Sequence, residues 1–232
     1  MNFEFKELEL KGAYLISNYY AGDSRGGFTK SFEKDIYKGA GIEFQLNETF
    51  ASRSMRNVIR GLHFQTRNPQ AKLVSVVAGR VWDVIVDLRP NSPTYKKWIS
   101  QELSADNHLS FYVPRGFAHG FASLEDNTVM LYQCDGKYDA ETDTGIIFND
   151  PEIGIDWPIE ENVAIHSTRD MKLQSFQEYL KNPMETGGIA KEQYLCLFQL
   201  HTNTKEGVRH EERDYNRSNR FYWKLAHAGI NK

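Results

Sequence analysis

Apolar and polar residues alternate in short runs along most of the chain, with turn-forming residues between the runs. In the run 81–88, every second side chain is apolar: Trp82, Val84, Val86 and Leu88. The intervening positions belong to the opposite face: Asp83, Ile85 and Asp87. A period of two is typical of a β-strand, and a turn at 78–80 joins this run to another at 72–77. The pattern therefore predicts a pair of adjacent strands.

Further runs of this kind lie at 109–113 and 128–134. Strands this short and this closely spaced are typical of a β-sandwich or barrel, and they do not fit βαβ units. Helices are expected only at 31–38 and 170–180, the second with an apolar stripe and a stop at Asn182-Pro183. The sequence predicts a mainly β fold with a few short helices.

The composition changes near residue 184. A glycine-containing stretch resembling a hinge at 184–188 precedes an apolar run at 194–200 and a segment of mixed charge at 201–220. At about 150 residues per domain, a chain of 232 residues fits one domain with an appendage. We therefore expect a domain over 1–183 and a C-terminal extension over 184–232 that packs on this domain or on a partner chain.

Charge and composition exclude several classes of protein. The formal net charge of −3 gives no basic surface for nucleic acid or an anionic membrane. No apolar run approaches the roughly 20 residues that span a bilayer, and the polar N-terminus does not resemble a signal peptide. Cys134 and Cys196 have no CxxC spacing, which favours free thiols in a reducing compartment. We expect a cytoplasmic protein that binds neither nucleic acid nor membrane.

Several common catalytic motifs are missing from the sequence. It contains no glycine-rich phosphate loop before a helix and no GxSxG elbow. No two of its seven histidines are two or four residues apart, which is the spacing of common metal-binding pairs. We therefore expect no metal, although a metal site assembled from distant residues stays open.

A dense polar cluster at 60–65, followed closely by Lys72, lies beside apolar strands. If 60–65 is extended, His63 and Gln65 lie on one face and the apolar side chains on the other. A histidine base with Lys72 and Arg60 in one concavity suits a reaction through an anionic intermediate. Alternatively, His63 is a hydrogen-bonded core residue and the cations are rim charges, so the local pattern leaves both interpretations open.

A second cluster, at 113–121, has the spacing P-x-G-x-x-H ending at His119, which resembles the second motif of the cupin superfamily. The first cupin motif would carry H-x-H and a later Glu. Here His63 is followed by Gln65, and Lys72 stands near the position of the acid. A cation there would repel a divalent metal. The pattern resembles a cupin barrel without its metal.

Longer motifs, in order along the chain, resemble those of the dTDP-4-dehydrorhamnose 3,5-epimerase family. They are NVIRGLHFQ at 57–65, PQAKLV at 69–74, DVIVDLR at 83–89, GFAHGF at 116–121, NDP at 149–151, IDWP at 155–158 and STRD at 167–170. The resemblance covers roughly residues 8–180. It implies a jelly-roll homodimer with exchanged N-terminal strands. It also implies cofactor-free epimerisation at C3 and C5 of a nucleotide-linked 4-keto-6-deoxyhexose, for a surface polysaccharide.

The resemblance implies roles for individual residues. His63 would be the base, oriented by Asp170, and Tyr132 would be the acid. The substrate contacts would be Arg60, Lys72 and His119 at the ketone oxygen and hydroxyls, Arg25 at the diphosphate, Tyr138 on the base, and Asp143 and Arg169 at further nucleotide or sugar groups. From the residues alone, Asp170 would cap the following helix and Tyr132 would be a core aromatic. The nearby cations are expected to lower the pKa of the Tyr132 phenol.

Some positions depart from the family pattern. Lys30 stands where the family has Glu, and Glu48 and Phe50 stand where it has Gln and Asn. Three further departures are Gln133, Asp143 and Phe148. These changes favour an altered nucleotide preference, with cytidine-, uridine- or guanosine-linked sugars in place of thymidine. A 3-epimerase, a 3,4-ketoisomerase and a non-catalytic sugar-binding cupin also stay open, although Tyr132 favours the 3,5-epimerase.

Overall fold

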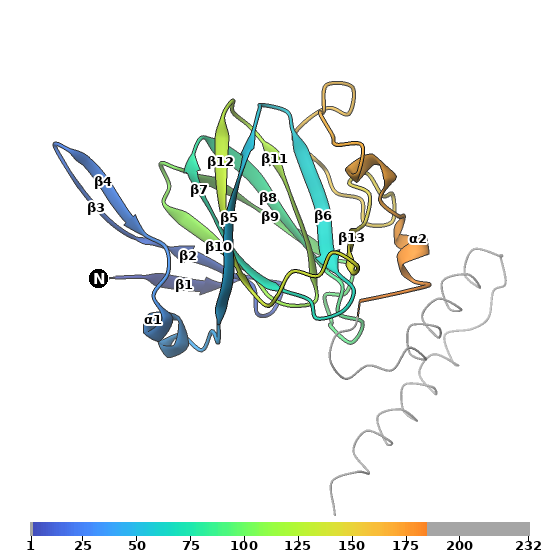
Figure 1. Cartoon of the computed structure of the whole chain (residues 1–232), viewed down its shortest axis with the longest axis horizontal. Helices are drawn as coiled ribbons and strands as arrows, with labels where there is room; N and C mark the ends of the chain where they lie inside the picture. The colour runs from blue at the N-terminus through green and yellow to red at the C-terminus, as the bar shows by residue number, and fades with distance from the viewer. Residues whose placement is uncertain (1, 185–232) are drawn as a thin grey trace, which may run out of the picture.

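The computed structural model of the chain describes residues 2–184. Within that range, antiparallel strands form two facing sheets and one separate hairpin (Figure 1). None of the helices between residues 2 and 184 has the length and apolar character that a membrane span requires. The extension and the hinge expected beyond residue 183 lie outside the described residues, apart from Met184, so the domain boundary stays a prediction.

The larger sheet has six strands in the spatial order β1-β2-β10-β7-β12-β5. Their bounds are β1 (Glu4–Glu7), β2 (Tyr14–Ser17), β10 (Leu109–Val113), β7 (Ala71–Ala78), β12 (Thr128–Asp135) and β5 (Leu46–Ser54). The strands expected at 72–77, 109–113 and 128–134 are β7, β10 and β12, so these predictions are confirmed.

The facing sheet has five strands in the order β13-β6-β11-β8-β9. Their bounds are β13 (Asp143–Gly145), β6 (Ile59–Gln65), β11 (Phe117–Ser123), β8 (Arg80–Asp87) and β9 (Trp98–Ser104). Successive strands such as β6 and β7, or β11 and β12, lie in opposite sheets, so the chain crosses repeatedly between the two layers. This is the architecture of a jelly roll. The mainly β, jelly-roll class predicted from the sequence is confirmed.

Strand β8 shows how the period-two pattern builds both faces of one sheet. Ile85 is fully buried in a cluster with Val74 and Phe111 of the facing sheet. Val84 and Val86 belong to a second cluster on the outer face, which the end of the described chain covers. Full burial of such a side chain contributes about 1.5–3 kcal/mol. Both faces of this sheet are therefore stabilised, and the alternation expected at 81–88 is confirmed.

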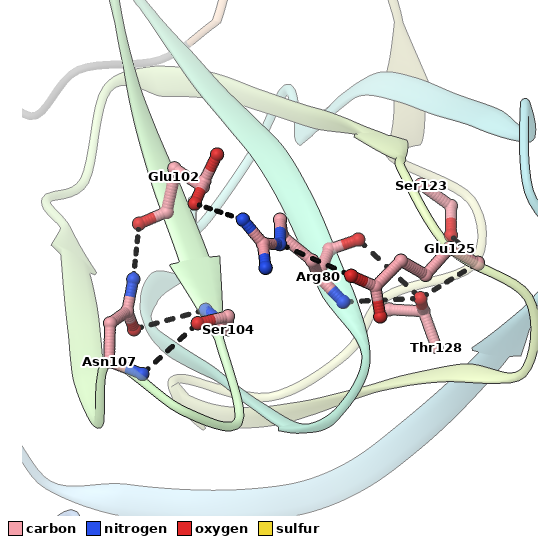
Figure 2. Close-up of polar contacts among 7 residues, drawn as sticks. All are labelled: Arg80, Glu102, Ser104, Asn107, Ser123, Glu125 and Thr128. Carbon is pink, nitrogen blue, oxygen red and sulfur yellow. Dashed lines mark hydrogen bonds and ion pairs between the residues drawn. The ribbon is translucent and has the colours of Figure 1, made fainter.

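Polar contacts link the turns at the end of the barrel where β7 is followed by β8 (Figure 2). Arg80 forms ion pairs with Glu102 at 3.1 Å and with Glu125 at 3.2 Å. Thr128 Oγ1 donates to the backbone oxygen of Glu125 at 2.9 Å. The turn needs glycine at position 79, because its φ is +76° and a Cβ there would lie 2.3 Å from Thr128 Oγ1.

The segment 170–180 is not the single helix expected from its apolar stripe. It forms a 3₁₀ turn, η1 (Asp170–Lys172), and a short helix, α2 (Phe176–Tyr179), separated by an extended Leu173. The carbonyl of Gln174 accepts a hydrogen bond from the chain after β13 at 2.9 Å. The Ser175 hydroxyl then accepts from the Glu178 N–H and starts α2 as a capping box. These two interactions interrupt the helix.

A two-stranded hairpin of β3 (Tyr19–Asp23) and β4 (Gly26–Lys30) projects away from the barrel (Figure 1). Tyr20 in β3 stacks on His108, which precedes β10, with ring centroids 3.8 Å apart. The helix α1 (Lys34–Gly39) follows the hairpin and begins later than expected, because Glu33 is still extended. The hairpin therefore contacts the barrel mainly near β10.

Candidate active site

A histidine–carboxylate pair joins β6 to η1. His63 Nε2 lies 2.8 Å from Asp170 Oδ1, and the Gly61 N–H donates to Asp170 Oδ2 at 3.4 Å. The side chain of Asp170 is 5% exposed and that of His63 is 27% exposed, so solvent reaches mainly the imidazole. Burial raises the pKa of Asp170, but the hydrogen bonds from His63 and Gly61 outweigh it and hold the pKa below its usual range. The N-cap of η1 is Arg169 and no side chain caps it, so the helix-cap interpretation of Asp170 is wrong.

A second pair of the same type lies on the neighbouring strands. His119 in β11 pairs directly with His63 in the strand register, so the two side chains share one face of the sheet. His119 Nε2 lies 3.0 Å and 2.9 Å from the two carboxylate oxygens of Asp83, and both residues are buried. Burial raises the pKa of Asp83, although His119 and Lys72 oppose the shift. Asp83 was not expected in the site. It could have been recognised because an acid two residues before the apolar Ile85 lies on the same face of the strand.

Tyr132 faces these histidines from the opposite sheet. Its ring stacks on Phe50 of β5, with centroids 4.7 Å apart and planes 12° apart. It also meets the edge of His119 at a centroid distance of 6.0 Å. Burial and the nearby Asp83 raise the pKa of the Tyr132 phenol, and the charge of Arg60 only partly opposes them. Arg60 acts in the expected direction, but the net shift of this pKa is upward, so the expected net lowering is wrong.

Lys72 approaches the same group of side chains from β7. It is half-buried, and burial lowers the pKa of its ammonium group. The negative charges of Asp83, Asp143 and Glu48 act in the opposite direction. Asp83 belongs to the facing sheet, so the Lys72 ammonium group is close enough to that sheet for the charge of Asp83 to act on it.

Arg60 reaches the site through an irregularity in β6. A strictly alternating strand would place Arg60 on the face opposite His63. Gly61 has φ +114°, a conformation open to glycine, and a Cβ there would lie 2.6 Å from the Gly120 Cα. The register with β11 also shifts here. Arg60 Nε then donates to Ser54 Oγ of the facing sheet at 3.1 Å.

Three further expected residues form a polar group beside β6. Arg169 donates to Asp143 Oδ2 at 2.7 Å, and the Tyr138 hydroxyl donates to the same oxygen at 3.1 Å. The charge of Asp143 raises the pKa of Tyr138. Asp143 pairs with Gln65 in the register of β13 and β6, which places this group next to the strand that carries His63.

Arg25 is the one expected site residue that the fold of the single chain does not bring to the others. It lies at the tip of the projecting hairpin, where it donates to Asp23 at 2.6 Å and its side chain is 87% exposed. The other nine lie between the two sheets or beside β6. No group of three side chains able to hold a metal ion is found within residues 2–184.

The sequence model of the dTDP-4-dehydrorhamnose 3,5-epimerase family matches residues 7–178. The chain belongs to this family. It is 45% identical over 158 residues to the dTDP-4-dehydrorhamnose 3,5-epimerase of Methanothermobacter thermautotrophicus, which covers 68% of this chain and 85% of that protein.

Solved structures of the epimerase family share its fold. The structure is similar to the crystal structure of the dTDP-4-dehydrorhamnose 3,5-epimerase from Elizabethkingia anophelis, with 41% identity and a TM-score of 0.72 over 78% of this chain and 99% of that one. It is also similar to the dTDP-6-deoxy-D-glucose-3,5-epimerase from Legionella pneumophila, crystallised with dTDP-4-keto-L-rhamnose, with 36% identity and a TM-score of 0.72 over 75% of this chain and 93% of that one. The expected enzyme class, a nucleotide-sugar 3,5-epimerase, is therefore confirmed.

Two departures from the epimerase pattern lie beside side chains that are expected to act on the sugar. Phe50 stacks on Tyr132, and Glu48 accepts a hydrogen bond from Gln70 Nε2 at 2.7 Å while its charge acts on Lys72. By contrast, Lys30 forms an ion pair with Glu33 beside α1. Phe148 stacks on His166 at 4.0 Å, on the outer side of the second sheet. Phe50 and Glu48 thus adjoin the groups expected to act on the sugar.

Proposed function

We propose that this enzyme inverts C3 and C5 of a dTDP-linked 4-keto-6-deoxyhexose without a cofactor. The single observation that carries the proposal is the His63–Asp170 pair facing Tyr132 across the barrel. Relatives crystallised with dTDP-4-keto-L-rhamnose, and with TDP and pyrophosphate, support thymidine as the nucleotide. A non-thymidine sugar, a single-site epimerase and a non-catalytic cupin are not favoured by these relatives.

The chemistry starts from the acidity of the ring hydrogens beside the ketone. Removing the proton from C3 or C5 gives a carbanion that is delocalised onto the C4 oxygen as an enolate. With Nε2 held by Asp170, the free Nδ1 of His63 accepts the proton. The carboxylate then stabilises the imidazolium. Lys72 and His119, on the opposing strands, supply charge and a hydrogen bond to the enolate oxygen.

Inversion needs a proton on the other face of the ring, and Tyr132 supplies it. Because the pKa of Tyr132 is raised above its ordinary value of about 10, the phenol is protonated at neutral pH. Transfer to carbon leaves a phenolate, whose charge Arg60 stabilises. Before the next turnover His63 releases its proton to solvent and the Tyr132 phenolate is protonated again, which resets both groups.

The nucleotide would lie beside β6, where Tyr138 stacks on the base and Arg169 and Asp143 contact polar groups. Arg25 would bind the diphosphate only if a second copy placed its hairpin at this site. We therefore propose a homodimer with exchanged N-terminal strands. Phe28 and Tyr20 on the hairpin are exposed aromatic side chains that a partner would cover. The buried free thiol of Cys134 agrees with a cytoplasmic location.

The reaction is tested by incubating the enzyme in D₂O with a dTDP-linked 4-keto-6-deoxyhexose and recording deuterium at each carbon by NMR. We expect label and inversion at both C3 and C5. Label at one carbon only indicates a single-site epimerase, and label at neither indicates a binding protein.

The dimer is tested by mixing two inactive variants, His63→Asn and Arg25→Ala, after unfolding and refolding them together. If Arg25 acts in the partner's site, mixed dimers contain one intact site and activity returns. If activity stays at the level of the separate variants, Arg25 does not act across a dimer.

A further inference from the structure

The side chain of Gln65 is a buried amide at the end of the strand that carries His63. It is 3% exposed, and its three polar contacts are all with backbone atoms. Nε2 donates to the carbonyl oxygens of Asn68 at 3.0 Å and Lys137 at 3.2 Å. Oε1 accepts from the Asp139 N–H at 2.8 Å. The amide therefore holds the chain on both sides of residue 138.

Tyr138, the residue between these two anchors, is itself poorly restrained by packing. The residue is 49% exposed, and within residues 2–184 its hydroxyl forms one hydrogen bond, to Asp143 Oδ2. Asp143 pairs with Gln65 in the register of β13 and β6. Tyr138 therefore depends on Gln65 in two ways. The Gln65 amide holds the backbone on either side of Tyr138, and Asp143, which accepts from the Tyr138 hydroxyl, pairs with Gln65 across the strands.

We propose that Gln65 is a positioning residue for the nucleotide, which acts by fixing the backbone at 137 and 139 so that the Tyr138 ring meets the base. This inference rests on the proposed role of Tyr138 in nucleotide binding. A ring on an exposed loop must be ordered before it can stack, and binding is weakened by the entropy of that ordering. By ordering the loop in advance, the Gln65 amide raises affinity without touching the ligand.

The chemistry of the amide distinguishes this role from simple filling of space. Two carbonyls and one N–H require two donors and one acceptor, which is what a glutamine amide offers. A methionine keeps the volume but loses all three bonds. A glutamate would place a carboxylate oxygen against the carbonyls of Asn68 and Lys137. Nucleotide affinity should therefore be lower in Gln65→Met than in the wild type, and lower still in Gln65→Glu.

The experiment measures KM and kcat for the dTDP-sugar, the Kd for dTDP by calorimetry, and the thermal midpoint. The variants are Gln65→Met, Gln65→Glu, Gln65→Asn, Tyr138→Leu and the double variant Gln65→Met/Tyr138→Leu. Gln65→Asn is a milder change than Gln65→Met, since it keeps a polar amide, although the shorter side chain cannot make all three bonds. We expect roughly tenfold weaker dTDP binding and higher KM for Gln65→Met, with kcat changed less than about twofold. The double variant should bind no more weakly than Tyr138→Leu.

Asn107, an exposed residue in the turn between β9 and β10, provides a control whose amide also contacts backbone atoms (Figure 2). Its amide also makes three backbone contacts: with the Glu102 oxygen at 2.9 Å, the Ser104 N–H at 3.0 Å and the Leu109 N–H at 3.1 Å. Asn107→Leu should lower the thermal midpoint as Gln65→Met does, while leaving the Kd for dTDP unchanged.

Specific results would overturn the inference. These are additive losses in the double variant, a fall in kcat as large as the rise in KM, or an equal loss of dTDP binding in Asn107→Leu. If Gln65→Met and Gln65→Asn bind dTDP normally while Tyr138→Leu binds it weakly, the role of Gln65 is overturned and that of Tyr138 stands. If Tyr138→Leu binds dTDP as tightly as wild type, the proposed nucleotide role of Tyr138 is wrong and this inference fails with it.

Discussion

Removing the Tyr132 hydroxyl should separate proton exchange from inversion. Tyr132→Phe deletes the proposed acid but keeps the ring that stacks on Phe50 and meets the edge of His119. The apolar contacts survive, so the free energy of unfolding should change by less than about 1 kcal/mol. His63 and Asp170 are untouched, so protons can still leave and return on the face of the ring that His63 contacts.

The size of the effect follows from how closely Tyr132 is packed. Its residue is buried, and Phe50 and His119 occupy two sides of the ring, so water cannot readily replace the lost donor. A positioned general acid contributes about 10²- to 10⁴-fold, which corresponds to roughly 3–5 kcal/mol in the barrier. We expect inversion to slow by this factor at one or both carbons, while deuterium exchange continues within about tenfold of the wild-type rate.

Both events can be followed in one NMR sample in D₂O. Exchange appears as loss of the C3 and C5 proton signals, and inversion appears as a changed coupling between ring protons. The raised pKa of Tyr132 adds a second expectation: the wild-type rate should show no loss from phenol ionisation below about pH 10. Inversion at the wild-type rate in Tyr132→Phe would refute the assignment, because another group or water would then be the acid. Loss of exchange together with inversion, in a folded variant, would mean that Tyr132 is needed for proton abstraction itself.

Four further outcomes are expected. Asp170→Asn should lower kcat roughly 30-fold, about 2 kcal/mol for a charged hydrogen bond, with wild-type Kd for dTDP; an unchanged kcat contradicts the pair's role. Asp87→Asn should lower the unfolding free energy by roughly 2 kcal/mol, since it leaves Arg89 without its buried acid. Hydrogen bonds outweigh burial and lower the pKa of Asp87. This stability is therefore present above the pKa of Asp87 in the unfolded chain, and it is lost as the pH falls through its pKa in the folded chain. Acid denaturation of the wild type and of Asp87→Asn measures the difference. Enzyme treated with EDTA should keep its full rate. A loss of activity that one divalent ion restores would contradict this prediction. Calorimetry should give tighter binding of dTDP than of UDP, CDP or GDP. Equal affinities would mean that the departures at Glu48 and Phe50 do affect nucleotide recognition.

The strands were predictable because their signal is local. A period of two, as at 81–88, follows from the geometry of any strand with two distinct environments. The expected helix at 170–180 failed for the opposite reason: its apolar stripe is local, but Gln174 pairs with the distant chain after β13. The cap at Ser175 was visible in the sequence as S-x-x-E, and it was the available signal for a later helix start.

The site was less predictable where burial and backbone irregularity decide the outcome. Alternation could not bring Arg60 and His63 to one site, because that requires the positive φ of Gly61. The direction of the Tyr132 pKa shift was wrong because charge can be read from a sequence and desolvation cannot. The position of Arg25 on a projecting hairpin also depends on tertiary structure, and the partner that would complete its site is not part of one protomer.

The two histidine–carboxylate pairs differ in burial, and this difference supports the different roles that we propose for them. His119 is held by both oxygens of Asp83, and neither residue of that pair is exposed, so its protons have no short path to solvent. His63 is held by one oxygen of Asp170 and keeps Nδ1 free on a partly exposed ring. A base that must release its proton after each turnover needs that exposure, whereas a donor that stabilises an enolate benefits from a fixed and dry position. The two rings are direct neighbours on adjacent strands, so one substrate would contact both, and the difference in exposure favours the proposed choice of His63 as the base.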